Sequence, residues 1–129
     1  RHSGWSDLLP KPYFAVADEG LFDLFRDSAR EGITIAAPGF YAPQGRWVRL
    51  EPADAHLNKK IESFEYEGRR ITNFEMESSA RAGMAPLMGP RAATSCTIMA
   101  QRIPLDACTD YKPFVKRMIR MALDKLATI

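Results

Sequence analysis

Three clusters of polar and aromatic side chains in this sequence could bind a small ligand that forms hydrogen bonds. The clusters are Phe40-Tyr41-Ala42-Pro43-Gln44-Gly45-Arg46, Asn73-Phe74-Glu75-Met76-Glu77-Ser78 and Gln101-Arg102. Aromatic rings stack on heterocycles, amides and guanidinium groups bind ring oxygens, and carboxylates accept hydrogen bonds from hydroxyl groups. Together these side chains suit a flat ligand that also carries hydroxyls.

Each cluster also has an ordinary structural interpretation. The first could be a proline-containing loop with one core aromatic ring, because loops carry filler residues as well as function. In the second, Glu77 could complement the positive N-terminus of a helix, with Met76 filling the core. Arg102 could form a surface ion pair. For the first two clusters, composition alone favours these alternatives.

The pattern of apolar residues predicts the elements that must hold the clusters. Helical spacing recurs in residues 18–30, 54–67, 77–89 and 112–126, and short runs at 33–37, 70–74 and 92–100 predict strands. Helices that alternate with short strands predict an α/β fold with a mostly parallel sheet and helices on both faces. Ligands of such sheets bind beyond the carboxyl ends of the strands, so we expect the three clusters to meet at one edge.

Composition and charge narrow the class of protein. The 129 residues contain 18 Lys and Arg against 16 Asp and Glu, a net charge of +2, and 46% are hydrophobic. These values are typical of one globular domain. We find no run of about 20 apolar residues and no long basic run, so we expect neither a membrane nor a nucleic acid as partner.

The cysteines and histidines predict neither a disulfide scaffold nor a metal site. Cys96 and Cys108 are too few for a scaffold, which favours a cytoplasmic setting, and we expect Cys96 to be a small core residue of the third strand. His2 and His56 lack metal-ligand spacing, so we expect no metal. Three strands would leave exposed sheet edges. Because the chain also starts without Met, we expect the remaining strands to come from polypeptide outside this sequence.

The first two clusters resemble motifs of one enzyme family. The first resembles the F-Y-x-x-Q-x-R segment of uridine phosphorylases, and the second resembles the N-Y/F-E-M-E-S segment of the wider nucleoside phosphorylase family. The third resembles a family strand that ends in Asn-Arg. The resemblance spans residues 10–126 and corresponds to the C-terminal half of a family chain. It implies a three-layer α/β/α sandwich of the nucleoside phosphorylase type, here incomplete, with residues 1–129 forming the C-terminal half of a single domain.

The resemblance implies a pentosyltransferase that converts uridine and phosphate into uracil and ribose 1-phosphate. Gln44 would bind the uracil O2 and N3–H edge, and Arg46 would address O4. Glu77 would bind the ribose hydroxyls. The substrate-binding residues implied are Phe40, Gln44, Arg46, Phe74, Glu75, Met76, Glu77, Met99 and Arg102, with Glu77 and Arg102 as catalytic residues. Donors and cations at the ring oxygens would stabilise charge that appears only in the transition state.

The resemblance also implies the partners of the site. Family chains build the phosphate site in their N-terminal half. The resemblance therefore implies that this chain needs the N-terminal half as a partner, with inorganic phosphate as co-substrate and no other cofactor. It also implies a homo-oligomer, either a dimer or a hexamer. Purine-handling relatives carry an Asp where this chain has Gln101-Arg102, which disfavours purine nucleosides. Phe74 stands where the family more often has Tyr. A nucleosidase that uses water and an inactive nucleoside-binding fragment remain alternatives, and the preference among uridine, deoxyuridine and thymidine stays open.

Overall fold

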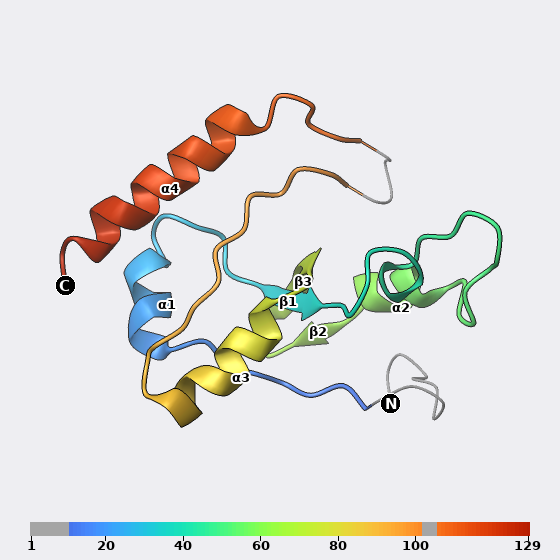
Figure 1. The fold of residues 1–129 in the computed structure, drawn as a ribbon, viewed down its shortest axis with the longest axis horizontal. Coiled ribbons are helices and arrows are strands. Elements are labelled where there is room, and N and C mark those ends of the chain that lie inside the picture. Colours follow the sequence, from blue (N-terminus) through green and yellow to red (C-terminus); the bar gives the residue numbers. More distant parts are fainter. Residues whose placement is uncertain (1–10, 102–105) are drawn as a thin grey trace.

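The computed structural model describes residues 11–101 and 106–129, which form four helices and a small sheet (Figure 1). The helices are α1 (Glu19–Phe25), α2 (Leu57–Glu62), α3 (Ser78–Met88) and α4 (Lys112–Leu126), and a 3-10 turn, η1, covers Ala42–Gln44. The strands are β1 (Ile33–Ala36), β2 (Glu65–Tyr66) and β3 (Arg69–Glu75). The fold is therefore mixed α/β. Within the described ranges no helix has both the length and the apolar character needed to span a bilayer.

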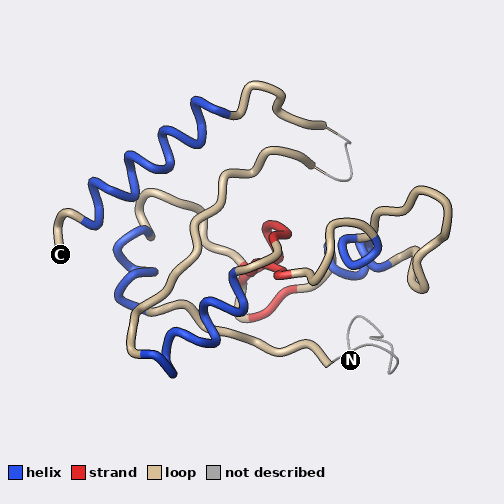
Figure 2. The backbone as a smooth tube through the Cα atoms, viewed as in Figure 1, coloured by secondary structure: helices blue, strands red, loops and turns tan. Residues whose placement is uncertain are grey.

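The three strands form one mixed sheet in the order β1-β3-β2 (Figure 2). β1 is parallel to β3, with Ala36 opposite Glu75, whereas β2 is antiparallel to β3. The predicted parallel arrangement is thus found for β1 and β3, whereas β2, which the sequence patterns did not predict, makes the sheet mixed. Glu67 and Gly68 were expected to end a helix. They instead form the β2–β3 turn with φ values of 50° and 74°, the positive φ pair that a tight hairpin favours.

The helices follow the predicted spans to different extents. α4 and α3 match the prediction, and α3 ends at Gly89, whose φ of 93° is the left-handed conformation typical of a helix C-terminus. α1 begins after Asp18, whose carboxylate accepts a hydrogen bond from the Leu21 backbone N–H at 2.9 Å. α1 and α2 are shorter than predicted. α2 begins at Leu57, three residues after the predicted start at residue 54, and His56 rather than Asp54 is its N-cap residue.

The predicted third strand is wrong. Residues 92–100 form no strand, and among the described residues Ala100 alone of this segment joins an isolated bridge, with Ala107. A strand needs a neighbouring backbone, and in the described part of the chain no backbone hydrogen bond involves residues 93–98. Cys96 is exposed rather than a core residue. The segment around it still touches the rest of the fold, because the Thr97 hydroxyl donates to the Met118 sulfur of α4 at 3.2 Å. Figure 1 shows this segment in orange, passing between α4 and the sheet.

The fold buries little apolar surface. The chain exposes 10496 Å², whereas a compact monomer of 14.5 kDa exposes about 6,900 Å². Among the described residues, Ala37 and Ala85 are the buried apolar side chains. α1 packs against α4, with an ion pair between Asp27 and Lys125 at 2.6 Å. The arrangement is a small sheet with four helices, and it does not confirm the predicted three-layer sandwich of the nucleoside phosphorylase type.

Candidate functional site

The carboxyl ends of β1 and β3 lie side by side, which brings the first two clusters to one edge of the sheet. Ala36 is opposite Glu75, and the Ala37 N–H donates to the Glu75 carbonyl at 2.8 Å. Two residues earlier on each strand, the Thr34 hydroxyl donates to the Asn73 side-chain oxygen at 2.8 Å. The segments that follow β1 and β3 therefore leave the sheet at neighbouring positions. Phe40 comes a few residues after β1, and Glu77 comes two residues after β3.

The segment after β1, residues 40–46, is named the base loop here. Local backbone hydrogen bonds shape it: the Gln44 and Arg46 N–H groups both donate to the Tyr41 carbonyl, at 2.9 and 3.0 Å. Gln44 is 4% exposed, the one buried polar side chain in the described part of the molecule. Gly45 turns the chain with a φ of 70°, a conformation that favours glycine. The tight turn places Gln44 and Arg46 on the same side.

Arg46 is held by three contacts within the base loop. Its Nη1 donates to Gln44 Oε1 at 2.8 Å and to the Phe40 carbonyl at 2.9 Å. Its Cζ lies 3.8 Å from the centre of the Phe40 ring, a cation–π contact. Tyr41 meets Phe40 edge-on, with 5.4 Å between ring centres. The sequence-predicted residues Phe40, Gln44 and Arg46 thus form one connected group. One face of the Phe40 ring is covered by the guanidinium, so a base that stacks on Phe40 needs the other face.

Glu75 holds the N-terminus of α3 rather than presenting a carboxylate to solvent. Its Oε2 accepts from the N–H groups of Glu77 and Ser78, both at 2.7 Å, and its Oε1 accepts from the Ser78 hydroxyl at 2.5 Å. Partial burial acts to raise the pKa of Glu75, but the hydrogen bonds from Ser78 and from the backbone outweigh it and leave the pKa below its ordinary value. Glu75 is therefore an ionised structural group.

Glu77 differs from Glu75 because its carboxylate makes no capping hydrogen bond to α3. Glu77 is exposed and occupies the N-cap position, just past the end of β3. Glu75, not Glu77, thus complements the helix N-terminus. No hydrogen bond or ion pair links Glu77 to Arg46 within residues 11–101 and 106–129, so the structure brings the two clusters to one edge without joining these two side chains.

The remaining predicted residues are spread more widely. Phe74 is half-buried on β3 opposite Ile35, and Met76 is 44% exposed beside Glu77. Met99 is 45% exposed on segment 92–100, called the unpaired segment because it joins no strand. The Met99 carbonyl accepts from the Cys108 N–H at 2.8 Å. Gln101 donates its N–H to the Asp106 carbonyl at 2.7 Å. Arg102 lies outside the described residues.

Two residues of this region were missed by the sequence analysis. Ser78 binds the Glu75 carboxylate through its hydroxyl and its backbone N–H, and the preference of acidic side chains for helix N-termini was an available signal. Asn58, on α2, lies directly against Gly45 of the base loop. No sequence signal marked Asn58, because the contact joins residues that are far apart along the chain.

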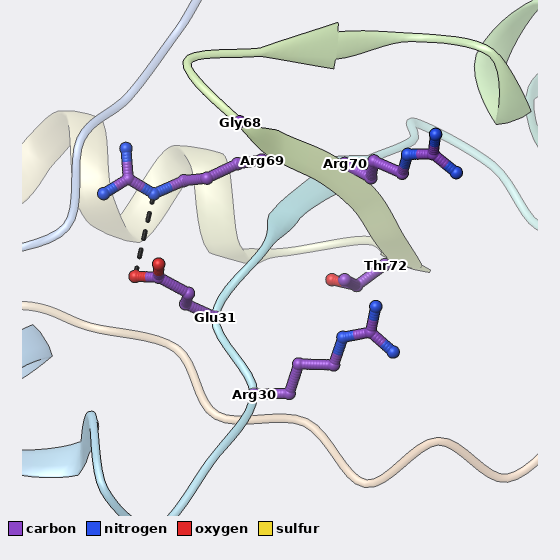
Figure 3. Close-up of a pocket in the computed structure, with 6 residues that line it drawn as sticks. All are labelled: Arg30, Glu31, Gly68, Arg69, Arg70 and Thr72. Atoms are coloured by element: carbon purple, nitrogen blue, oxygen red, sulfur yellow. Dashed lines mark ion pairs between the residues drawn. The ribbon is translucent and has the colours of Figure 1, made fainter.

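A separate hollow of about 420 Å³ lies at the opposite, amino-terminal edge of the sheet (Figure 3). It is lined by Arg30, Glu31, Gly68, Arg69, Arg70 and Thr72. Figure 3 shows Arg69 directed toward Glu31, at 3.7 Å, and Arg69 also lies 3.8 Å from Glu67. Acidic neighbours thus partly neutralise the positive charge of the arginines. The hollow also lies at the opposite end of the strands from the predicted site residues. We assign the candidate site to the carboxyl edge because the polar groups converge there.

The described residues contain no group of three or more His, Cys, Asp or Glu side chains that could hold a metal ion. His56, the histidine within these residues, is exposed at the start of α2. Comparison of the sequence with protein-family models and curated proteins, and of the fold with solved structures, finds no match.

Proposed function

We propose that this chain supplies the base and ribose contacts of a uridine phosphorylase-like pentosyltransferase. The observation that supports the proposal is the adjacency of Ala36 and Glu75, which places the base loop and Glu77 at the same edge of the sheet. The base loop offers an amide and a guanidinium already held together by a 2.8 Å hydrogen bond. Glu77 offers an exposed carboxylate for hydroxyl groups.

In the proposed reaction the bond between ribose C1′ and uracil N1 breaks while a phosphate oxygen bonds to C1′. The bonding electrons leave with uracil, and negative charge spreads onto O2 and O4. In the proposed complex the Gln44 amide lies along the O2 and N3–H edge of uracil, and its Oε1 also accepts from Arg46. Arg46 keeps further N–H donors for O4. These fixed donors stabilise the charge as it develops.

Glu77 has the complementary role on the sugar. Its carboxylate accepts hydrogen bonds from the ribose hydroxyls and favours the positive charge that builds on the sugar as the bond to uracil breaks. Glu75 supports this role indirectly, because its hydrogen bond to the Glu77 N–H at 2.7 Å fixes the backbone from which Glu77 extends. Met76, Phe74, Met99 and Arg102 complete the proposed site.

The proposed partner is the N-terminal half of the same protein, with phosphate as co-substrate and a homo-oligomer in a cytoplasmic setting. The large exposed area and the unpaired segment 92–100 support the need for further polypeptide. If this polypeptide pairs with the segment, amide hydrogen exchange of residues 93–98 is slower in the intact protein than in the 129-residue chain. Equal exchange in both would argue against this partner.

The direct test is uracil release from uridine by the intact polypeptide, with and without phosphate. Release that requires phosphate supports the proposal. Release independent of phosphate identifies the water-using nucleosidase, and calorimetric binding of uridine without turnover identifies the inactive binding fragment. Inosine is the matched control substrate, because cleavage of inosine but not of uridine would reverse the predicted base preference.

A further inference from the structure

Asn58 has a buried side-chain oxygen with no hydrogen-bond partner in the part of the chain that the structure describes. Asn58 is the second residue of α2, the helix that leads toward the β2–β3 hairpin. A buried acceptor without a donor destabilises a folded protein, so its presence calls for an explanation. The explanation lies in what the amide contacts.

The Asn58 amide occupies the space beside Gly45 of the base loop. A Cβ atom at Gly45 would lie 2.5 Å from Asn58 Nδ2 and 2.7 Å from Oδ1, closer than real side chains approach. Two independent features favour glycine at position 45. Its φ of 70° disfavours other residues, and Asn58 fills the space that a side chain would take. Asn58 contributes this contact from outside the base loop.

The geometry of Gly45 sets the position of Arg46. The Gly45 N–H donates to the Ala42 carbonyl at 2.9 Å. The turn at Gly45 folds the chain back, so that the Arg46 guanidinium lies over the Phe40 ring. The hydrogen bonds of Arg46 to Gln44 and to the Phe40 carbonyl depend on this turn of the backbone. A shift of Gly45 toward Asn58 would separate the guanidinium from both partners.

We infer that Asn58 is a positioning residue of the base loop, which acts by packing against Gly45 and keeps Arg46 against Gln44 and Phe40. The inferred effect of Asn58 on uridine rests on the proposed function, whereas its effect on the loop does not. Asn58 touches the loop and not the reacting atoms. Packing that fixes a binding group before the ligand arrives improves affinity by preorganisation.

The test uses Trp47, which directly follows Arg46 and is 52% exposed. The sequence has two tryptophans, so a Trp5→Phe background makes Trp47 the single fluorescent reporter. In this background we compare Asn58→Ala, which empties the space beside Gly45, with Asn58→Leu, which fills it without the unpaired oxygen. Lys59→Ala, an exposed neighbour on the same helix, is the matched control.

Asn58→Ala is expected to increase acrylamide quenching of Trp47 measurably and to weaken uridine binding by the intact protein about tenfold, with little change in melting temperature. Asn58→Leu should keep both properties near those of the parent, and Lys59→Ala should change neither. Unchanged quenching in Asn58→Ala, or an equal change in Lys59→Ala, would overturn the inference.

A second pair of variants tests the contact itself. Gly45→Ala should disturb Trp47, and adding Asn58→Ala should restore part of the parental quenching, because the clash disappears while the backbone strain remains. Absence of any restoration would also contradict the inference. If no variant and no parent protein binds uridine, the proposed function fails, and the quenching measurements still decide the role of Asn58.

Discussion

Two extended segments of this chain, β1 and residues 92–100, have similar compositions and different surroundings. Both lack charged residues, and both are rich in small or β-branched side chains. β1 pairs along its length with β3, and its half-buried residues lead into Ala37, which is 3% exposed. Residues 92–100 pair with no strand among the described residues, and most of their side chains are exposed. Composition sets the tendency to extend, and a neighbouring backbone decides whether a strand forms.

The difference bears on function because the candidate clusters are divided between these regions. The base loop and Glu77 follow the paired strands, where the Ala37 N–H and the Glu75 carbonyl fix their starting points. Met99 and Arg102 belong to the unpaired segment and to residues beyond it. An exposed extended segment without charges is open to pairing with another chain. The paired edge is therefore preorganised by this chain, whereas segment 92–100 pairs with no strand among the described residues.

Proline substitutions should separate the two regions most strongly. The Ala37 N–H points to β3, and the two-residue period of a strand directs the Ile35 N–H the same way. Ile35→Pro removes this donor, leaves its acceptor on β3 without a partner and should destabilise the chain by about 1 to 3 kcal/mol. Thr94→Pro, in the unpaired segment, should change the free energy of unfolding by less than about 0.5 kcal/mol. Urea unfolding followed by circular dichroism measures both, and equal losses would refute the contrast.

Substitutions in the base loop should lower activity on uridine far more than a substitution outside it. We expect Arg46→Ala to lower kcat/KM for uridine about a hundredfold in the intact protein, or about 2.7 kcal/mol, because a fixed cation at the leaving base is lost. Gln44→Ala should act in the same direction. His56→Ala is the control, since His56 is exposed, and should leave kcat/KM nearly unchanged. Similar losses for Arg46 and His56 would remove the base loop from the proposed site.

Much of the local structure was predictable from sequence because its causes are local. Asp18 at the start of α1, Gly89 at the end of α3 and the apolar stripe of α4 each act within one or two helical turns. The sequence also predicted two of the strands, at 33–37 and 70–74, and a mostly parallel sheet, and β1 and β3 are a parallel pair. These elements positioned the first two clusters correctly at one edge.

The remaining features depend on contacts between distant residues. Glu67-Gly68 fits a helix end and a hairpin turn equally well, and pairing of β2 with β3 decides between them. Residues 92–100 have strand composition, but pairing depends on a partner that composition cannot supply. The contact of Asn58 with Gly45 likewise comes from the packing of α2. Tertiary context thus decided each feature that the patterns missed.

A smaller effect tests how the paired edge continues into α3. Ser78→Ala removes the 2.5 Å hydrogen bond to Glu75 Oε1 and should cost about 1 kcal/mol of stability. Ser79→Ala, one residue later, loses only an exposed 3.1 Å hydrogen bond from the Tyr13 hydroxyl and should cost less. Urea unfolding of the two variants gives the comparison. A larger loss for Ser79 would contradict the assigned role of Glu75.

The smallest expected effect concerns pH, and it arises from the same carboxylate. The pKa of Glu75 is lower in the folded chain than its ordinary value, so the unfolded chain binds the proton more readily. The stability that Glu75 contributes is therefore complete above about pH 4.3, the ordinary value for Glu, and is lost as the pH falls through the lower folded pKa. Glu75→Gln should flatten the decline of stability in this acidic range.

Some acid sensitivity should remain in Glu75→Gln, because hydrogen bonds from Lys125 and Lys60 also lower the pKa values of Asp27 and Asp54. Asp27 joins α1 to α4, and Asp54 precedes α2, so neither belongs to the paired edge. Asp27→Asn is thus the matched control. Urea unfolding between pH 3 and pH 6 should show a change in Glu75→Gln that adds to that in Asp27→Asn, since independent sites contribute additively. An identical pH profile in Glu75→Gln and the parent would show that the edge is not held by this carboxylate.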